Sequence, residues 1–257
     1  MSADREFHIW EGVYQHWDDA PQLGDAFNNE KWLAEQAAAI SAEISDQTGE
    51  HGTIPACAIS RDYILPVIAA LAVQQGHLKI LDFGGGLASS YPLVMGSIPG
   101  SERIEFHVVE GSGICERGRK QFAGLSNLQF HTSIPKEDAH FDIVHAGRSF
   151  QYIDDWRALL TTFSNLRPRY LVLAGLLAGD ISPFVSLQNY YGCKIRVRFL
   201  NRDELIKAIE QLGFRLVYKS LHLSKRLGKE GPLPMGNFSI ENRLEHPCQL
   251  LFEWVNQ

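Results

Sequence analysis

Long hydrophobic runs and paired cysteines are both missing from this sequence. No stretch approaches the roughly 18 to 20 consecutive apolar residues of a membrane span, and the N-terminus MSADREFHIWEG lacks the charged-then-apolar order of a signal peptide. The four cysteines, Cys57, Cys115, Cys193 and Cys248, lie far apart and form no Cys-x-x-Cys pair, which argues against a zinc site or a disulfide framework. The sequence therefore predicts a cytoplasmic protein with no membrane partner, reduced and mostly buried thiols, and no bound metal ion.

Internal repeats, low-complexity tracts and an excess of positive charge are also absent. The net charge of −6 argues against nucleic acid as a partner. Charge is nevertheless uneven, because residues 1–50 hold eleven acids and two bases, whereas residues 165–230 hold twelve bases and five acids. Two interpretations stay open. In the first, the two regions are solvated faces or lie against one another. In the second, the basic region borders a site for an anionic substrate.

The chain is long enough, at 257 residues of which 45% are hydrophobic, to bury the core of one α/β domain with an appendage. Residues 28–47 carry apolar side chains at helical spacing, and a second helix is expected over residues 61–75, kinked at Pro66. We expect residues 1–75 to form a helical N-terminal cap that is not an independent domain, followed by a core over residues 76–257. The apolar positions of the first helix are Leu33, Ala37, Ile40 and Ile44.

Beyond the cap, apolar segments rich in β-branched residues alternate with segments of helical composition. This alternation predicts parallel strands with helical crossovers, and hence an open, doubly wound sheet. Two late strands follow the helix NRDELIKAIEQLGF without a crossover helix between them, which predicts an antiparallel pair at the sheet edge. The expected strands are LKILDF (78–83), IEFHVVE (104–110), LQFH (128–131), FDIVHAG (141–147), YLVLAGLL (170–177), FRLVYKSLHL (214–223) and CQLLFEWV (248–255).

The stretch ILDFGGGLASSY (80–91) places a glycine cluster after the first strand of this series and before a helix expected to start near Leu87. Glycines permit positive φ and close backbone approach, and a helix N-terminus aims free N–H groups at a ligand. The dinucleotide pattern GxGxxG is broken at Ser89, and no Gly-Lys-Ser/Thr follows, which excludes a P-loop. The pattern acid-x-Gly-x-Gly-x-Gly/Ala is met by Asp82, Gly84, Gly86 and Ala88.

That pattern resembles motif I of class I S-adenosylmethionine-dependent methyltransferases. The resemblance implies a Rossmann-like α/β fold with a seven-stranded sheet of order 3-2-1-4-5-7-6, and S-adenosylmethionine as cofactor, with Asp82 near the ammonium of its amino-acid moiety. Glu110 ends the second strand, where a carboxylate can accept both ribose hydroxyls. The stretch FDIVHAGRSFQYIDDW (141–156) resembles motif IV and the segment after it. The expected cofactor-binding residues are Asp82, Phe83, Gly84, Gly85, Gly86, Glu110, Gly111, Ser133, Ala146, Gly147 and Arg148.

Segments outside these motifs resemble a family of bacterial methyltransferases associated with surface-polysaccharide and related biosynthesis clusters. They are IWEGVYQHWDDA (9–20), FVSLQN (184–189) and RFLNRDELIKAIEQLGFRLV (198–217). The resemblance implies a methyltransferase whose partner is a small-molecule substrate. We expect an anionic or sugar-containing acceptor, methylated at oxygen, and a protein that is a monomer or a homodimer. No DPPY-type or NPPY-type signature of nucleic-acid amino methylation is present, in line with a small acceptor.

Methyl transfer to a hydroxyl needs a group that takes the hydroxyl proton, and histidine suits that role near neutral pH. His145, at the end of a predicted buried strand, is the candidate catalytic residue, and the alternative is a satisfied core histidine. Asp154 and Asp155 are expected to cap a helix and not to bind metal. An NAD-dependent oxidoreductase and a catalytically silent S-adenosylmethionine-binding protein stay open as alternatives. The expected substrate-binding residues are Tyr14, Gln151, Tyr152, Gln188 and Asn189.

Overall fold

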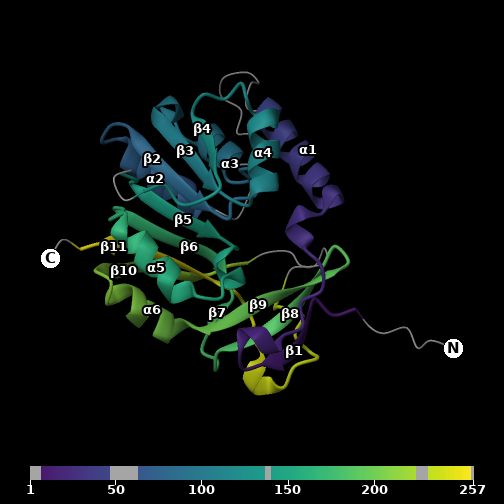
Figure 1. The fold of residues 1–257 in the computed structure, drawn as a ribbon. Coiled ribbons are helices and arrows are strands. Elements are labelled where there is room, and N and C mark those ends of the chain that lie inside the picture. Colours follow the sequence, from purple (N-terminus) through teal and green to yellow (C-terminus); the bar gives the residue numbers. More distant parts are fainter. Residues whose placement is uncertain (1–6, 47–62, 137–139, 224–230, 256–257) are drawn as a thin grey trace.

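Two sheets build the fold, and helices cover both faces of the larger sheet (Figure 1). The computed structural model describes residues 7–46, 63–136, 140–223 and 231–255. Cys57 and the bases Lys225, Arg226 and Lys229 lie outside these ranges. The helices are α1 (Glu30–Asp46), α2 (Ile64–Val73), α3 (Tyr91–Ser97), α4 (Ser112–Gln121), α5 (Trp156–Asn165) and α6 (Arg202–Glu210).

The larger sheet has seven strands in the order β10-β11-β6-β5-β2-β3-β4. Neighbours from β6 to β4 run parallel, whereas β11 pairs antiparallel with both β6 and β10. Counted along this sheet alone, the order is the predicted 3-2-1-4-5-7-6, so the class I methyltransferase topology and the late antiparallel pair are confirmed. Its strands are β2 (Leu78–Phe83), β3 (Ile104–Val109), β4 (Leu128–His131), β5 (Ile143–Gly147), β6 (Tyr170–Leu176), β10 (Phe214–Leu221) and β11 (Cys248–Trp254).

Each face of the seven-stranded sheet has its own hydrophobic core. Helices α1 to α4 pack on one face, and α5 and α6 pack on the other. The cap helix α1 contributes Leu33 and Ile40 to the same cluster as Ile80 of the central strand β2. The α2 helix begins two residues before Pro66, so the proline sits in the first turn, where its missing N–H interrupts no helical hydrogen bond. The predicted cap helices are therefore present and share the core of the sheet.

A second sheet was not predicted and lies to one side of the first, at the lower right of Figure 1. Its order is β1-β8-β9-β7, from β1 (Trp10–Tyr14), β8 (Phe184–Tyr190), β9 (Cys193–Asn201) and β7 (Ala178–Gly179). Trp10 of β1 lies opposite Gln188 of β8 in an antiparallel pairing. The cap is thus not helical throughout, because its first described segment is a strand of this sheet.

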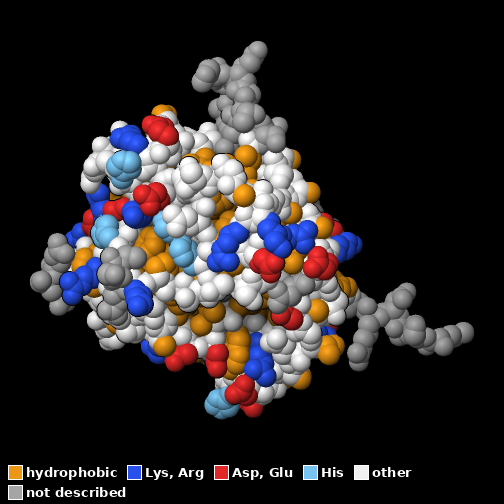
Figure 2. Space-filling view, turned by 45° about the horizontal axis from the view of Figure 1, so that its top comes forward, with side chains coloured by type: hydrophobic (Ala, Val, Ile, Leu, Met, Phe, Trp, Pro, Cys, Tyr) orange, Lys and Arg blue, Asp and Glu red, His pale blue; other side chains and the backbone are white. Residues whose placement is uncertain are grey.

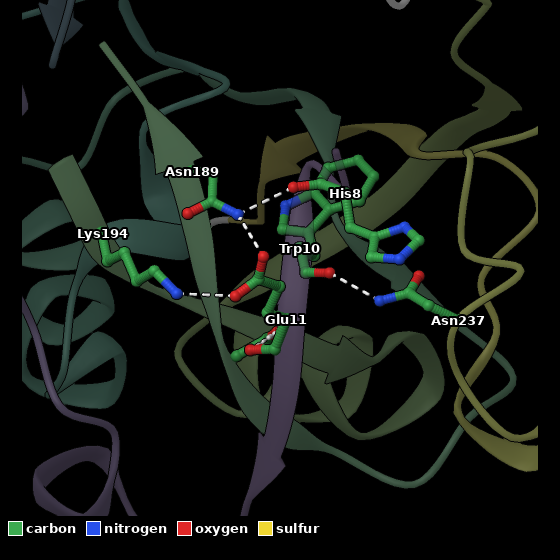
Figure 3. A network of polar contacts seen from close by, with 7 residues as sticks. His8, Trp10, Glu11, Asn189, Lys194 and Asn237 are labelled. Atoms are coloured by element: carbon green, nitrogen blue, oxygen red, sulfur yellow. Dashed lines mark hydrogen bonds and ion pairs between the residues drawn. The ribbon is translucent and has the colours of Figure 1, made fainter. Parts of the chain in front are cut away.

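Glu11 holds β1 to the hairpin formed by β8 and β9 (Figure 3). Its carboxylate accepts from Asn189 Nδ2 at 2.8 Å and from Lys194 Nζ at 2.6 Å. These two partners lower the pKa of Glu11 below its usual value, the hydrogen bond from Lys194 having the largest effect. On the other side of the strand, Asn237 Nδ2 donates to the Trp10 carbonyl at 2.8 Å. The N-terminal strand is therefore fixed from both sides.

The acidic N-terminal region and the basic region of the sequence meet in the second sheet. Lys194 pairs with Glu11, and Arg196 Nη1 lies 2.9 Å from Asp18 Oδ1. Arg198 of the same strand pairs with Asp154 at 2.9 Å, and on the face drawn in Figure 2 basic and acidic side chains also lie interleaved. For Lys194 and Arg196, whose partners belong to the acidic N-terminal region, the two charged regions lie against one another, as in the first interpretation. Across the described ranges, no helix is both long and apolar enough to span a membrane.

Candidate active site

The glycine cluster forms a tight turn at the carboxyl end of β2. Gly84 and Gly86 have φ of 66° and 60°, and Ala88 has φ of 69°. Because left-handed residues cannot continue a right-handed helix, α3 begins at Tyr91 and not near Leu87 as expected. The Ser149 hydroxyl donates to the Phe83 carbonyl at 2.6 Å and thereby fastens the turn to the segment after β5.

Glu110 lies directly beneath this turn, at the end of β3. Its carboxylate accepts from the backbone N–H of Gly86 at 3.1 Å and from that of Gly111 at 3.0 Å. Burial raises the pKa of Glu110 above its usual value, and the nearby negative charge of Asp82 raises it further, against the two backbone hydrogen bonds. Each carboxylate oxygen keeps a second lone pair for a ligand hydroxyl.

Asp82 and His145 form a buried pair on adjacent parallel strands. They are register partners on β2 and β5, and His145 Nδ1 lies 2.7 Å from Asp82 Oδ1. Their exposed fractions are 1% and 4%. An ionised carboxylate only accepts hydrogen bonds, so beside an ionised Asp82 the donor of this hydrogen bond is Nδ1 of His145. The Cε1 and Nε2 edge of the ring faces Gly147, whose added Cβ would lie 2.7 Å from Cε1 and 3.2 Å from Nε2.

A cavity of about 260 Å³ opens beside this pair. Its floor is the carboxyl end of β5 and β6, and its walls come from the start of α3 and from the cap. A volume near the lower end of the range for small-ligand pockets suits one part of a ligand. The residues that line it are Glu43, Ile64, Leu65, Ser89, Ser90, Leu93, His145, Gly147, Arg148 and Ala174.

The other predicted cofactor residues are not all placed with their side chains at the turn. Phe83 packs edge-on against Phe163 of α5, with ring centroids 5.5 Å apart, and Ala146 is buried in the same core. The side chains of these two residues therefore belong to the hydrophobic core, and their part in cofactor binding stays a prediction. Gly111 and Ser133 are exposed at the ends of β3 and β4, at the same sheet edge.

The five predicted substrate residues fall into two groups, one on each side of the second sheet. Gln188 Oε1 accepts from the Tyr152 hydroxyl at 3.0 Å and from Trp10 Nε1 at 3.3 Å, on the face toward the glycine turn. Gln151 follows β5, is buried and donates to the Arg148 carbonyl at 2.9 Å. Asn189 and Tyr14 lie on the opposite face, because consecutive strand residues point to opposite sides. The structure thus places Asn189 and Tyr14 away from Gln188, and their contact with substrate stays a prediction.

Sequence reasoning missed the aromatic side chains that connect the second sheet to the turn. Phe27 lies edge-on to Tyr152 at 5.1 Å and to Trp32 at 6.1 Å, and it also packs near Tyr190. Trp32 in turn reaches Gly86, where an added Cβ would meet its ring at 3.9 Å. Aromatic residues in an amphipathic helix are typical of a core, so the sequence carried no separate signal for this contact.

The comparison with protein families decides the class. The profile of a family described as "Methyltransferase domain" matches residues 56–219, which is more than half of the chain. The chain belongs to this methyltransferase family. No curated protein sequence matches this methyltransferase.

Solved structures with the same fold as this methyltransferase are distant in sequence. An S-adenosylmethionine-dependent methyltransferase from Clostridium acetobutylicum ATCC 824 shares 10% identity at a TM-score of 0.52, over 87% of this chain and 99% of that one. A chain of the complex between the Haloferax volcanii Trm112 methyltransferase activator and a methyltransferase shares 12% identity at a TM-score of 0.52, over 89% and 96%. These likenesses concern the fold.

The family and the fold bear out the predicted cofactor of this methyltransferase. The family is one of methyltransferases, and the Clostridium acetobutylicum protein of the same fold is S-adenosylmethionine-dependent. The closer resemblance to a polysaccharide-cluster family is not confirmed by these comparisons, and neither the acceptor nor the atom that receives the methyl group follows from them.

Proposed function

We propose that this methyltransferase transfers a methyl group from S-adenosylmethionine to a hydroxyl of a small molecule bound in the cavity. The observation that carries the proposal is the buried pair of Asp82 and His145 at the edge of that cavity, next to the glycine turn. A histidine held by a carboxylate is suited to accept a proton from a hydroxyl, and proton removal is the step that O-methylation adds to a displacement at carbon.

The turn fits the cofactor in its shape and in its unsatisfied groups. Added Cβ atoms would lie 2.3 Å from Ser149 Cβ at Gly84 and 2.5 Å from Asp82 Oδ2 at Gly85, so the turn is packed for glycine alone. Asp82 Oδ2 is buried and has no hydrogen-bond partner within the described part of the chain. We propose that Asp82 Oδ2 accepts from the cofactor ammonium and that Glu110 accepts from its ribose hydroxyls.

The bound cofactor supplies a sulfonium methyl group that is open to in-line displacement. Asp82 and Glu110 would hold the cofactor so that this methyl group passes to the acceptor oxygen as the carbon–sulfur bond breaks, with the electron pair of that bond left on sulfur. His145 Nε2 takes the hydroxyl proton. The chain contributes alignment, by holding both reactants at near-attack distance between the turn and the end of β5, and it keeps water away through the aromatic roof of Phe27, Tyr152 and Trp32.

Asp82 would then have two roles, one at each oxygen of its carboxylate. Oδ1 fixes the tautomer and the ring orientation of His145, and it stabilises the imidazolium that forms when the proton arrives. Oδ2 faces the glycine turn. One carboxylate therefore links the donor end of the site to its proton acceptor, which keeps the two in a fixed relation.

The acceptor is proposed to be anionic or sugar-containing. Arg148 lines the cavity and supplies a positive charge that an anionic group can meet, whereas Ser89 and Ser90 supply hydroxyls suited to sugar hydroxyl groups. Gln188 accepts hydrogen bonds at Oε1 from Tyr152 and Trp10, and these orient its side-chain amide. Its Nε2, a hydrogen-bond donor, therefore points away from both of them. A monomer or homodimer, a cytoplasmic location and a domain boundary near residue 75 stay predictions from the sequence.

The first test is cofactor binding by isothermal titration calorimetry. S-adenosylhomocysteine is expected to bind in the roughly 1 µM to 1 mM range typical of enzyme ligands, and NAD is expected to release no heat under the same conditions. Absence of binding at millimolar S-adenosylhomocysteine would overturn the proposed function. Binding without methylation of any pool of small molecules would favour the catalytically silent alternative.

The second test concerns pH, because burial raises the pKa of Glu110 above its usual value of 4.5. The ionised carboxylate accepts from ribose hydroxyls, whereas the protonated form loses acceptor capacity. The affinity for S-adenosylhomocysteine should therefore fall as pH drops through this raised pKa, by about tenfold or more between pH 8 and full protonation. Calorimetry at a series of pH values measures this. Glu110→Gln should bind weakly with no such pH dependence, and a flat profile for the unaltered protein would refute the role of Glu110.

A further inference from the structure

A buried tryptophan of the cap lies beside the glycine turn and carries an unsatisfied donor. Trp32 is only 7% exposed, and its Nε1 has no hydrogen-bond partner among the residues that the structure describes. Buried N–H groups almost always have an acceptor, because leaving one unsatisfied is costly. A buried donor without an acceptor beside a ligand site is a group that a ligand can satisfy.

The position of Trp32 relative to the turn is well defined. Asn29 Oδ1 accepts from the backbone N–H of Lys31 at 3.0 Å and of Trp32 at 3.2 Å, which starts α1 with Trp32 in its first turn. The far edge of the Trp32 ring lies 3.9 Å from the position of a Cβ added to Gly86. The backbone N–H of the same Gly86 donates to Glu110, the residue proposed to hold the ribose. Trp32 and Glu110 therefore lie next to the same residue of the turn.

The cap helix that presents Trp32 is tied to the core along its length. Glu30 pairs with Arg117 of α4 at 3.0 Å, and Gln121 of α4 donates to the Ala37 carbonyl at 2.9 Å. Glu35 accepts from the hydroxyl of Tyr191, at the end of the β8 and β9 hairpin, at 2.6 Å. These contacts hold α1 against both the helical layer and the second sheet, so the indole is placed by a rigid element.

We propose that Trp32 is a cofactor-binding residue, whose ring forms a wall of the cofactor site and whose Nε1–H donates to an oxygen of the cofactor. The oxygens available are the ribose hydroxyls and the carboxylate of the amino-acid moiety. Phe27 packs against the indole edge-on and extends the wall toward Tyr152. The inference rests on the proposed function, since it takes the methyl-donor cofactor as the ligand of the turn.

The experiment uses S-adenosylhomocysteine as the probe and the indole N–H resonances of the five tryptophans as the readout. Saturation of the unaltered protein is expected to shift one indole resonance strongly, and Trp32→Phe should remove that resonance from the spectrum. The same variant keeps an aromatic ring but lacks the N–H, so its affinity should fall by about 3- to 10-fold, as for loss of one hydrogen bond. Calorimetry measures the affinity.

Trp254→Phe is the matched control, because Trp254 packs against Phe214 with centroids 4.9 Å apart at the end of β11. It should leave the S-adenosylhomocysteine affinity and the shifted resonance unchanged. If the unaltered protein binds the probe but the Trp32 resonance does not move, or Trp32→Phe binds equally well, the inference is wrong while the proposed function stands. If Trp32→Phe does not fold, phenylalanine variants of the other four tryptophans assign the Trp32 resonance by elimination, and its shift in the unaltered protein decides. Absence of any binding would refute both.

Discussion

His145→Asn is expected to lower the rate of methyl transfer by about 10² to 10⁴, the usual range for loss of a general base. The affinity for S-adenosylhomocysteine should stay unchanged, because the asparagine amide can replace Nδ1 of the ring as the hydrogen-bond donor to Asp82. Transfer of labelled methyl from S-adenosylmethionine to a pool of small-molecule extracts measures the rate, and calorimetry measures the binding. The separation of a lost rate from a retained affinity is what distinguishes a proton acceptor from a core histidine.

The control for this variant is His140→Asn, which changes a side chain that is 71% exposed and lies 3.3 Å from Asp142. It should leave the rate unchanged. Asp82→Asn should also lower the rate, since the equivalent change in Ser-His-Asp enzymes costs about 10⁴-fold through the wrong tautomer. It should in addition weaken S-adenosylhomocysteine binding, because Oδ2 faces the turn. Full activity of His145→Asn would show that His145 only packs in the core.

Gly84→Val is expected both to destabilise the fold and to abolish cofactor binding. The sequence alone predicts a smaller effect, in which Gly84→Val weakens the cofactor site but leaves the fold largely intact. The structure adds a cost in stability. In the structure, Gly84 has φ of 66° and its added Cβ would lie 2.3 Å from Ser149 Cβ, so valine combines left-handed strain with a clash. Strain and overpacking together cost about 2 to 5 kcal/mol. Thermal unfolding should show a melting temperature lower by about 5 to 15 °C for a domain of this size.

Gly124→Ala provides the comparison for Gly84→Val. An added Cβ at Gly124 has nothing within 4 Å, and this glycine does not have a left-handed φ. Its melting temperature and its S-adenosylhomocysteine affinity should both match those of the unaltered protein. A Gly84→Val protein that melts at the usual temperature and binds normally would mean that the turn is not packed against Ser149.

The seven-stranded sheet could be predicted because each buried parallel strand is a short apolar run and the crossovers are amphipathic. The pairing of Asp82 with His145 was also within reach of the sequence. Both residues were placed near the ends of predicted strands, and the order 3-2-1-4-5-7-6 makes those two strands neighbours. Register partners on adjacent parallel strands point to the same face, so the topology together with the register seen in the structure brings the two side chains into contact.

The second sheet and the aromatic roof could not be predicted in this way. The strand β1 carries Gly12 and the exposed Val13, so its alternation is weak and its pairing with β8 depends on a partner distant in sequence. The sequence prediction treats Gln188 and Asn189 as part of a loop after the fifth strand, where both could face substrate. The strand pairing separates them. The late start of α3 was missed because Ala88 has a left-handed backbone conformation, which an alanine in the sequence does not predict.

The pairing of β1 with β8 has a consequence for how the chain folds. The hydrogen bond from Trp10 to Gln188 joins residues 178 positions apart, and contacts of such separation form slowly because a long loop must close first. During synthesis, β1 emerges early and has no partner until the hairpin has been made. The hairpin is made before β10 and β11, the last two strands of the seven-stranded sheet. A newly made chain therefore carries β1 unpaired while most of that sheet is being made.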